Sequence, residues 1–292
     1  MSAVFGKEFK SMMRTMVAPI FISFVLFWFG IMTAQICLGF NNRNVAYSQF
    51  EYVVSNASFI SLIAIPLLTM RSFADERHNG SDKLLYSLPI KTKSIVIAKY
   101  FAALAVFAIP TAIVALYPFV LAKFGTIYLN TAYSSLLAFF ILGAALIAIG
   151  IFISSLTESQ VIAAIITLMS IFLVAYMSDL SSFLPSTRAF SLIFLILIAL
   201  IIGVVTYVLT KSYIASGVVF LAGCAASVIG FIIKKEEFEG LAQRIVSKLD
   251  FFEKLNNFFY GKLDVTAVIF YLSAIVFFLF LTCQAVEKKR WN

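Results

Sequence analysis

Charge is scarce in this chain. Only 12% of its 292 residues are Asp, Glu, Lys or Arg, whereas 62% are hydrophobic. A soluble globule of this length cannot hide so much apolar surface, so the composition excludes a soluble enzyme or carrier. It predicts an all-α integral membrane protein, a polytopic helical bundle, because helices satisfy their own backbone groups in lipid.

The groups that membrane chemistry needs are also missing. His78 is the one histidine, so neither a two-histidine zinc site nor a Ser-His pair can form at membrane depth. A phosphate loop is absent, because Asn256 stands where a first glycine would have to precede Gly261-Lys262. The expected spans hold almost no ionisable residues, which counts against an ion-coupled carrier. We expect no catalytic residue, no metal site and no cofactor on this chain.

Cysteines are few and scattered. Cys37, Cys224 and Cys283 fall in or beside apolar runs, as small hydrophobic residues do, which excludes a disulfide framework or a metal cluster. The first apolar run is too long for a cleavable signal peptide and is expected to anchor the chain. The net charge of +8 comes mostly from residues at the ends of apolar runs, where they orient and anchor spans, so we expect no nucleic-acid partner.

Eight apolar runs approach the roughly 20 residues that cross a bilayer. They cover residues 17–38, 57–70, 95–121, 135–156, 161–177, 189–209, 213–233 and 265–283. Seven spans is the competing count, because Lys211-Ser212 leaves room for only a tight turn. The excess of Lys and Arg in alternate loops, Lys99 included, places both termini in the cytosol. Lys234 and Lys235 argue the other way, although Glu236 and Glu237 balance them.

Two segments have amphipathic spacing and are expected to lie on the bilayer. Residues 1–16 predict a basic interfacial helix on the cytosolic side. Residues 234–264 predict an outer amphipathic helix, with apolar positions from Phe238 to Phe259. That outer helix is either simple interfacial packing or a lid over an outward path.

Small residues recur at helix-packing spacing in two of the expected spans. The first set is Gly143, Gly150 and Ser154, and the second is Gly223, Ser227 and Gly230. Such faces let helices approach closely. They predict packing within the chain or a dimer interface.

A charged segment separates the second and third apolar runs. Its helix is expected to continue from Arg71 to His78 and to stop at Asn79-Gly80, since glycine tolerates the left-handed conformation. Ser81 can cap a second short helix that Pro89 ends. The pattern alone fits either an ordinary interfacial loop or a segment that a cytosolic partner binds.

The order Phe-Ala-Asp-Glu-Arg-x-x-Gly-Ser-x-x-Leu-Leu-x-x-Leu-Pro, over residues 73–89, resembles the corresponding stretch of ABC-2 type permeases. These are membrane subunits of ATP-binding-cassette exporters of the type V kind. Residues 271–281, followed by Glu287-Lys-Lys-Arg-Trp291, are similar to the C-terminus of the gliding-motility-associated branch.

The resemblance implies that this segment is the coupling helix that contacts a separate ABC ATPase. The positions that would carry this role are Phe73, Glu76, Arg77, Gly80, Ser81, Leu84, Leu85 and Pro89. It also implies that ATP and magnesium bind the ATPase, that a second copy or a related permease completes the transporter, and that the chain lies in a bacterial plasma membrane. Relatives of this type have six spans, so residues 189–233 are expected to be an inserted pair.

The expected organisation follows from these segments. An interfacial helix (1–16) precedes spans one and two (17–71), the coupling segment (72–93), spans three to five (94–177) and the inserted region (178–233). The outer segment (234–264), the last span (265–284) and a basic tail (285–292) complete it. An ATP-independent channel or secondary carrier, and a membrane anchor or assembly factor, are the alternatives to a permease subunit; nothing in the sequence selects a substrate.

Overall fold

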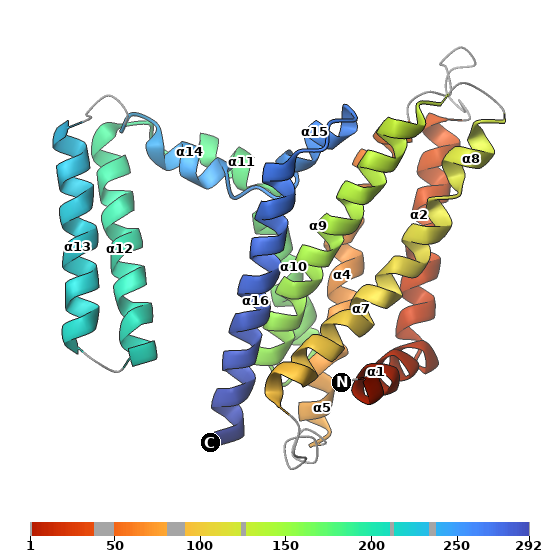
Figure 1. Cartoon of the computed structure of the whole chain (residues 1–292), viewed down its shortest axis with the longest axis horizontal. Coiled ribbons are helices and arrows are strands. Elements are labelled where there is room, and N and C mark those ends of the chain that lie inside the picture. The colour runs from red at the N-terminus through yellow and green to blue at the C-terminus, as the bar shows by residue number, and fades with distance from the viewer. Residues whose placement is uncertain are drawn as a thin grey trace. The chain divides into compact units, whose positions relative to one another are not determined.

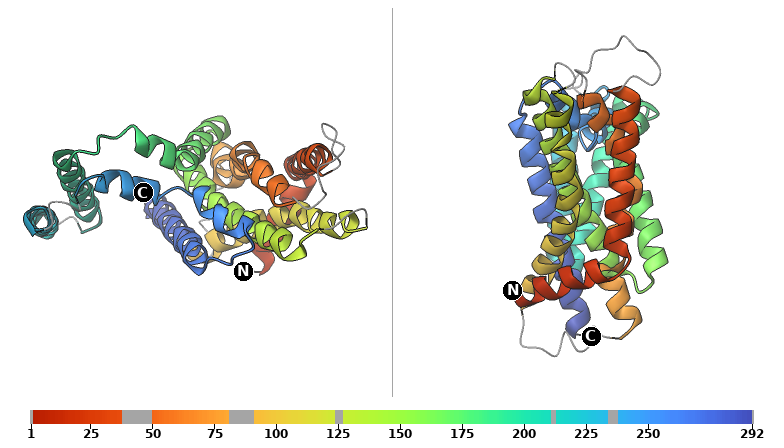
Figure 2. Two further views of the ribbon diagram at one scale, coloured as in Figure 1. Left: turned by 90° about the horizontal axis from the view of Figure 1, so that it is seen from above. Right: turned by 90° about the vertical axis from the view of Figure 1, so that its right-hand side faces the viewer.

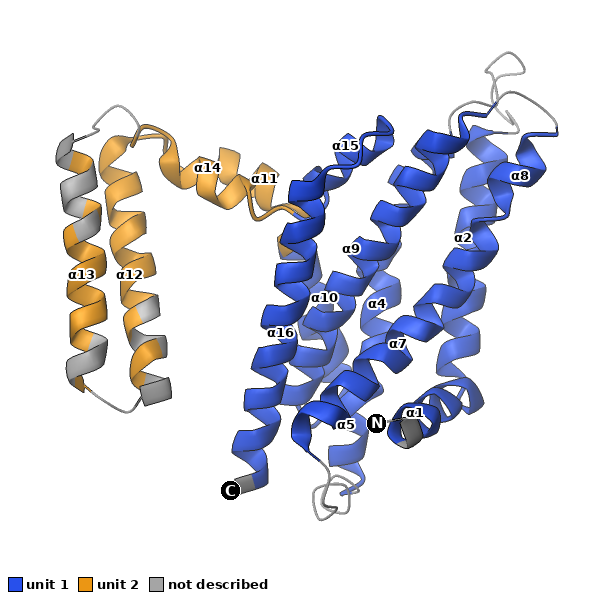
Figure 3. Ribbon diagram, viewed as in Figure 1, with its two compact units in different colours: residues 1–173, 251–292 blue, residues 174–250 orange. Residues whose placement is uncertain are grey.

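The computed structural model describes residues 2–37, 50–80, 91–123, 127–210, 213–233 and 238–291. Within these ranges the regular structure is entirely helical (Figure 1). The chain divides into two compact units, with residues 1–173 and 251–292 in unit 1 and residues 174–250 in unit 2 (Figure 3). The expected all-α polytopic architecture is confirmed.

Unit 1 contains most of the helices. They are α1 (Ser2–Arg14), α2 (Val17–Ile36), α3 (Phe50–Ser58), α4 (Ser61–Thr69), α5 (Arg71–His78), α7 (Thr92–Val114), α8 (Tyr117–Leu121), α9 (Leu129–Leu156), most of α10 (Gln160–Ala175), a 3-10 turn η1 (Glu253–Leu255), α15 (Asn256–Phe259) and α16 (Val265–Trp291). The short helix α1 lies across the ends of the long helices (Figure 2, right). In this unit α1, α5 and the C-terminal end of α16 share one end, which we call the terminal end (Figure 1).

Four stretches in the described residues are long and apolar enough to cross a membrane: α2, α7 with α8, α9 and α16. A fifth span is formed if α3 joins the continuous stretch 61–78, which is bent against α3 by 53°. The bend falls at Phe59 and Ile60, where backbone hydrogen bonds such as Ile60 N to Ala57 O (3.0 Å) tighten to three-residue spacing. Each of the eight predicted runs holds a helix or part of one, and the number of crossings stays a prediction.

Helix α9 is the centre of unit 1. It contacts α3, α4, α5, α7 and α16 (Figure 2, left). Glycine permits two of these contacts, because a Cβ on Gly143 would overlap the ring of Phe107, and a Cβ on Gly150 would overlap the Thr69 side chain. The small residues of α9 therefore face neighbouring helices of the same chain.

Unit 2 contains α11 (Met177–Ser182), α12 (Arg188–Thr210), α13 (Tyr213–Ile233) and α14 (Leu241–Ser247). Helices α12 and α13 pack against each other. Gly223 makes the approach possible, since its Cβ would lie 2.7 Å from that of Ala199. Ser227 donates to its own helix at Gly223 O (2.8 Å), and the packing of Gly230 lies outside the described part of the structure.

The outer amphipathic segment differs from the single helix expected over residues 238–259. Helix α14 ends at Ser247, and η1 and α15 follow as separate short pieces. The break has a polar cause, because the buried Asp250 carboxylate accepts a hydrogen bond from the Ser178 backbone N–H (3.1 Å). The two halves of the segment belong to different units.

Candidate functional site

The charged segment forms α5, which continues the second span beyond its apolar part. Asn79 caps the helix, and Gly80 takes a φ of +67°, a conformation that glycine adopts without strain. The predicted stop at Asn79-Gly80 is therefore where α5 ends. Four of the proposed coupling positions, Ser81, Leu84, Leu85 and Pro89, lie outside the described residues.

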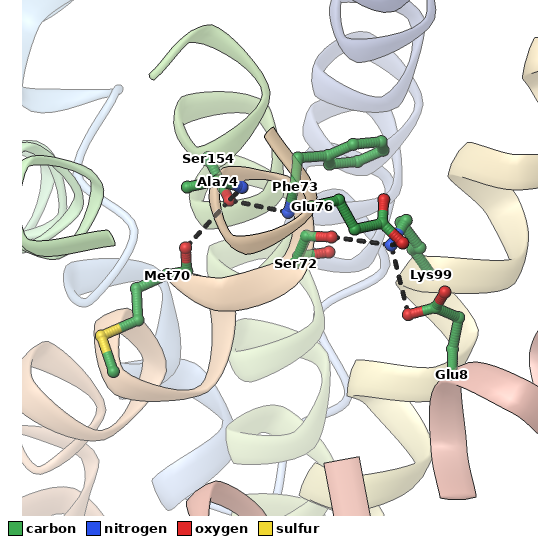
Figure 4. A network of polar contacts seen from close by, with 8 residues as sticks. All are labelled: Glu8, Met70, Ser72, Phe73, Ala74, Glu76, Lys99 and Ser154. Carbon is green, nitrogen blue, oxygen red and sulfur yellow. Dashed lines mark hydrogen bonds and ion pairs between the residues drawn. The ribbon is translucent and has the colours of Figure 1, made fainter. Parts of the chain in front are cut away.

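A buried ion cluster joins α5 to two other helices at the terminal end (Figure 4). The Lys99 Nζ atom, on α7, lies 3.0 Å from Glu76 Oε1 of α5 and 3.2 Å from Glu8 Oε2 of α1. It also donates to the Ser72 carbonyl oxygen (2.7 Å) and lies 5.0 Å from the centroid of the Phe73 ring. The cluster thus connects three helices through one ammonium group.

The lysine of the cluster is more deeply buried than its two carboxylates. The Lys99 side chain is 1% exposed, whereas those of Glu8 and Glu76 are 11% and 19% exposed. Both carboxylates line a polar pocket of about 230 Å³ that Lys7 and Arg71 also line. A buried ammonium is costly unless it is paired, so Lys99 depends on both carboxylates, while these keep access to water and to other cations.

Ser154 forms a second contact, between α9 and the junction of α4 and α5 (Figure 4). Its Oγ accepts hydrogen bonds from the backbone N–H groups of Phe73 (3.0 Å) and Ala74 (3.2 Å). The same hydroxyl donates to Met70 O (3.2 Å). The residue expected to be a small packing position is therefore a polar link at the base of α5.

The far side of α5 is tied to the end of α9 and the start of α10. Gln160 donates to Asp75 Oδ1 (2.6 Å) and accepts from Arg71 Nε (3.0 Å). Arg77 donates from Nη1 to Thr157 O (3.2 Å). Helix α5 is therefore held on several sides by α1, α7, α9 and α10.

These contacts limit how far a partner protein can reach the proposed coupling residues of α5. Phe73 is 1% exposed, and Glu76 and Arg77 contact other helices of the same chain. His78, Asn79 and Gly80, at the end of α5, are exposed. Among the described residues of the segment, a partner can reach the tip of α5 more readily than its body.

Lys99 and Glu8 were not recognised as site residues from the sequence. Lys99 counts toward the cytosolic excess of basic residues in the sequence, and the structure adds that its side chain is buried and paired. A lysine four residues inside a predicted span was the available signal, since a charge at that depth needs a partner. Glu8 was the matching signal, because it is an acidic residue on an otherwise basic amphipathic helix and can pair with a buried lysine.

Comparison with known families places most of the chain in a described family. Residues 4–221, about three quarters of the chain, match the family described as ABC-2 family transporter protein. The matched stretch contains most of α1, all of α5, Lys99 and Ser154. Among curated proteins and solved structures, none matches the chain. The assignment to the gliding-motility branch stays a prediction.

Membership in a family of membrane transport components agrees with the long apolar helices of the chain. Membership also implies an ABC ATPase as partner, since permeases of this kind hydrolyse no ATP themselves. The chain therefore belongs to the ABC-2 transporter family, as a multi-pass permease component.

Proposed function

We propose that this chain is the permease subunit of an ABC exporter in a bacterial plasma membrane. A separate ATPase subunit would bind ATP and magnesium, and a second copy or a related permease would complete the pathway. The observation that carries the proposal is the attachment of α5, which polar contacts hold to α1, α7, α9 and α10 while its tip stays exposed.

The attachment suggests how force would pass from the ATPase to the spans. The ATPase would contact the tip of α5 and the coupling segment that follows, on the cytosolic side. Because α5 is bonded on several sides, its displacement would shift the helices it touches and would not be absorbed locally. Coupling then requires two arrangements of the bundle, between which ATP binding changes the populations.

Lys99 and Ser154 would have different tasks in this movement. Lys99 links α5 to α1 and α7, whereas Ser154 links it to α9, the central helix. Together they would make α1, α5 and the parts of α7 and α9 at the terminal end move as one rigid body. Helix α1 would then move together with α5, in addition to lying on the membrane surface.

Purification of the tagged chain from its native membranes tests the proposal. We expect an ATPase subunit to copurify, and the complex to hydrolyse Mg-ATP. Reconstituted vesicles should then move substrate only when ATP is present. Transport without ATP would favour a channel or secondary carrier, and an intact assembly in which no function depends on an ATPase would favour an anchor; either result contradicts the proposal.

A further inference from the structure

A small pocket lies in unit 1 between α3 and the segment that contains α15. Its volume is about 190 Å³. The lining residues are Glu51, Tyr52, Ser55, Asn256, Phe259 and Tyr260. One carboxylate, three aromatic rings, a hydroxyl and an amide therefore surround a space the size of a small organic cation.

The carboxylate of this pocket has an unused oxygen. Glu51 Oε2 is buried and has no hydrogen-bond partner among the described residues. Glu51 stands in the first turn of α3, where the helix dipole favours a negative charge. A carboxylate oxygen shielded from water is stabilised by a cation, which the described residues around it do not supply.

The aromatic residues complement this charge. Tyr52 is 54% exposed and Tyr260 is 77% exposed, so much of both rings is free for a ligand. Aromatic faces attract cations, and rings placed beside a carboxylate are a recurring way to hold quaternary and other alkylated ammonium groups. A bare metal ion would leave the aromatic lining unused, whereas an organic ammonium group can contact both the carboxylate and the rings.

The walls of the pocket are fixed before any ligand arrives. Phe59 stacks on Phe252, with ring centroids 5.6 Å apart, and so joins the end of α3 to the segment before α15. Ser134 of α9 donates to Phe258 O (2.6 Å), which holds α15 in place. Binding therefore costs little ordering of the protein.

We propose that this pocket binds an alkylammonium group, either on a soluble amine or on the headgroup of a choline or ethanolamine lipid. The juxtaposition of Glu51 with Tyr52, Phe259 and Tyr260 carries the proposal. It does not depend on coupling to an ATPase, so its failure would leave the permease assignment untouched.

Calorimetric titration of the full chain in a neutral detergent tests the proposal with two matched probes. Choline carries the quaternary ammonium group, and 3,3-dimethylbutan-1-ol is its neutral isostere. We expect choline to bind at least about tenfold more tightly than the alcohol, which corresponds to one charge-assisted interaction. Equal binding of the two probes, or no binding of choline, would overturn the proposal.

Three variants locate the site. Glu51→Gln should lower the affinity for choline about tenfold and leave the weak binding of the alcohol unchanged. Glu158→Gln, which changes an exposed carboxylate outside the pocket, should bind choline as the parent chain does. If Glu51→Gln fails to fold, Tyr260→Leu, at an exposed ring, should reduce choline affinity severalfold. Unchanged affinity in Glu51→Gln or in Tyr260→Leu would contradict the assignment.

Lipid composition separates the two sources of the group. Choline is titrated into the chain in nanodiscs of phosphatidylglycerol and, in parallel, of phosphatidylcholine. At high salt, which screens the attraction of choline to anionic phosphatidylglycerol, weaker apparent binding in phosphatidylcholine would show that lipid headgroups compete for the pocket. Equal affinity in both discs, with Glu51→Gln still weakening it, would assign the pocket to soluble amines.

Discussion

Lys99 Nζ lies 3.0 Å from Glu76 Oε1, which joins the start of the third apolar run to the charged end of the second. Because Glu8 lies 3.2 Å from the same ammonium, one buried cation serves two carboxylates. The cluster is therefore asymmetric. Loss of the cation leaves two neighbouring anions, whereas loss of one carboxylate leaves a matched pair.

This asymmetry predicts unequal effects of substitution. Lys99→Met should destabilise the chain by about 3–5 kcal/mol, the usual cost of breaking a buried ion pair from one side. Glu8→Gln should cost roughly 1 kcal/mol, because Glu76 still pairs with Lys99. Thermal unfolding in detergent measures both, with Lys93→Met, at an exposed lysine of the same helix, as the control. Equal losses in Lys99→Met and Glu8→Gln would rule out the asymmetric cluster.

Ser154 should matter far more than the serine beside it. Ser154→Ala leaves two backbone N–H groups of α5 without their acceptor, which should cost about 1–3 kcal/mol. Among the described residues, the Ser155 hydroxyl donates only to Phe152 O in its own helix (2.6 Å). Ser155→Ala is therefore the matched control and should cost less than about 1 kcal/mol. Unfolding curves of the two variants decide the point, and similar curves would contradict the link between α9 and α5.

Two glycines should respond with opposite signs. Gly150→Ala forces a Cβ into the Thr69 side chain, so it should cost about 1–3 kcal/mol. Gly30→Ala meets nothing within 4 Å in α2, and alanine in an open helix should stabilise it by about 0.5–1 kcal/mol. Melting temperatures that fall equally in both variants would show that α9 does not pack as described.

Asp264 should make the start of α16 sensitive to acid. The Asn257 side chain donates to its carboxylate (2.7 Å), the N–H groups of Ala267 and Thr266 also donate to it, and together these bonds hold the pKa of Asp264 below its ordinary value of 3.8. A lowered pKa means that the ionised form stabilises the folded state above pH 3.8 and that this contribution is lost as the pH falls further.

The measurement compares the parent chain with Asp264→Ala by circular dichroism melting at neutral pH and in acid. The variant should melt at a lower temperature at pH 7, and the difference should shrink below pH 3.8. Asp179→Ala, at a carboxylate outside this turn, controls for general effects of acid. A difference that stays constant across this range would exclude an ionised cap at Asp264.

The local features of this fold could be predicted, because they depend on residues close in sequence. Apolar runs marked the helices, and Asn79-Gly80 marked the end of α5. The break in the outer segment could not be predicted in this way. It depends on the contact between Asp250 and the backbone of Ser178, and the three helices α12, α13 and α14 lie between these residues in the sequence.

The site was only half predictable for the same reason. The motif located α5, but the spacing could not show that Glu76 turns inward to a lysine on the next helix. Charged positions in such a motif look alike whether they face a partner or the chain itself. Long-range pairing decides between the two. It turns Glu76 and Arg77 toward other helices of the chain and leaves His78 exposed at the tip of α5.

The central claim is that the tip of α5 contacts an ATPase subunit. It is tested by cross-linking in a background where Cys37, Cys224 and Cys283 are replaced by alanine, with a single cysteine introduced by His78→Cys. Tyr128→Cys is the control: this exposed residue directly precedes α9, and α9 begins at the end of unit 1 opposite to the terminal end (Figure 1). We expect a bifunctional thiol-to-amine reagent to join His78→Cys, and not Tyr128→Cys, to the ATPase in native membranes. An intact complex that gives no cross-link at His78→Cys, or gives it equally at Tyr128→Cys, would contradict the account.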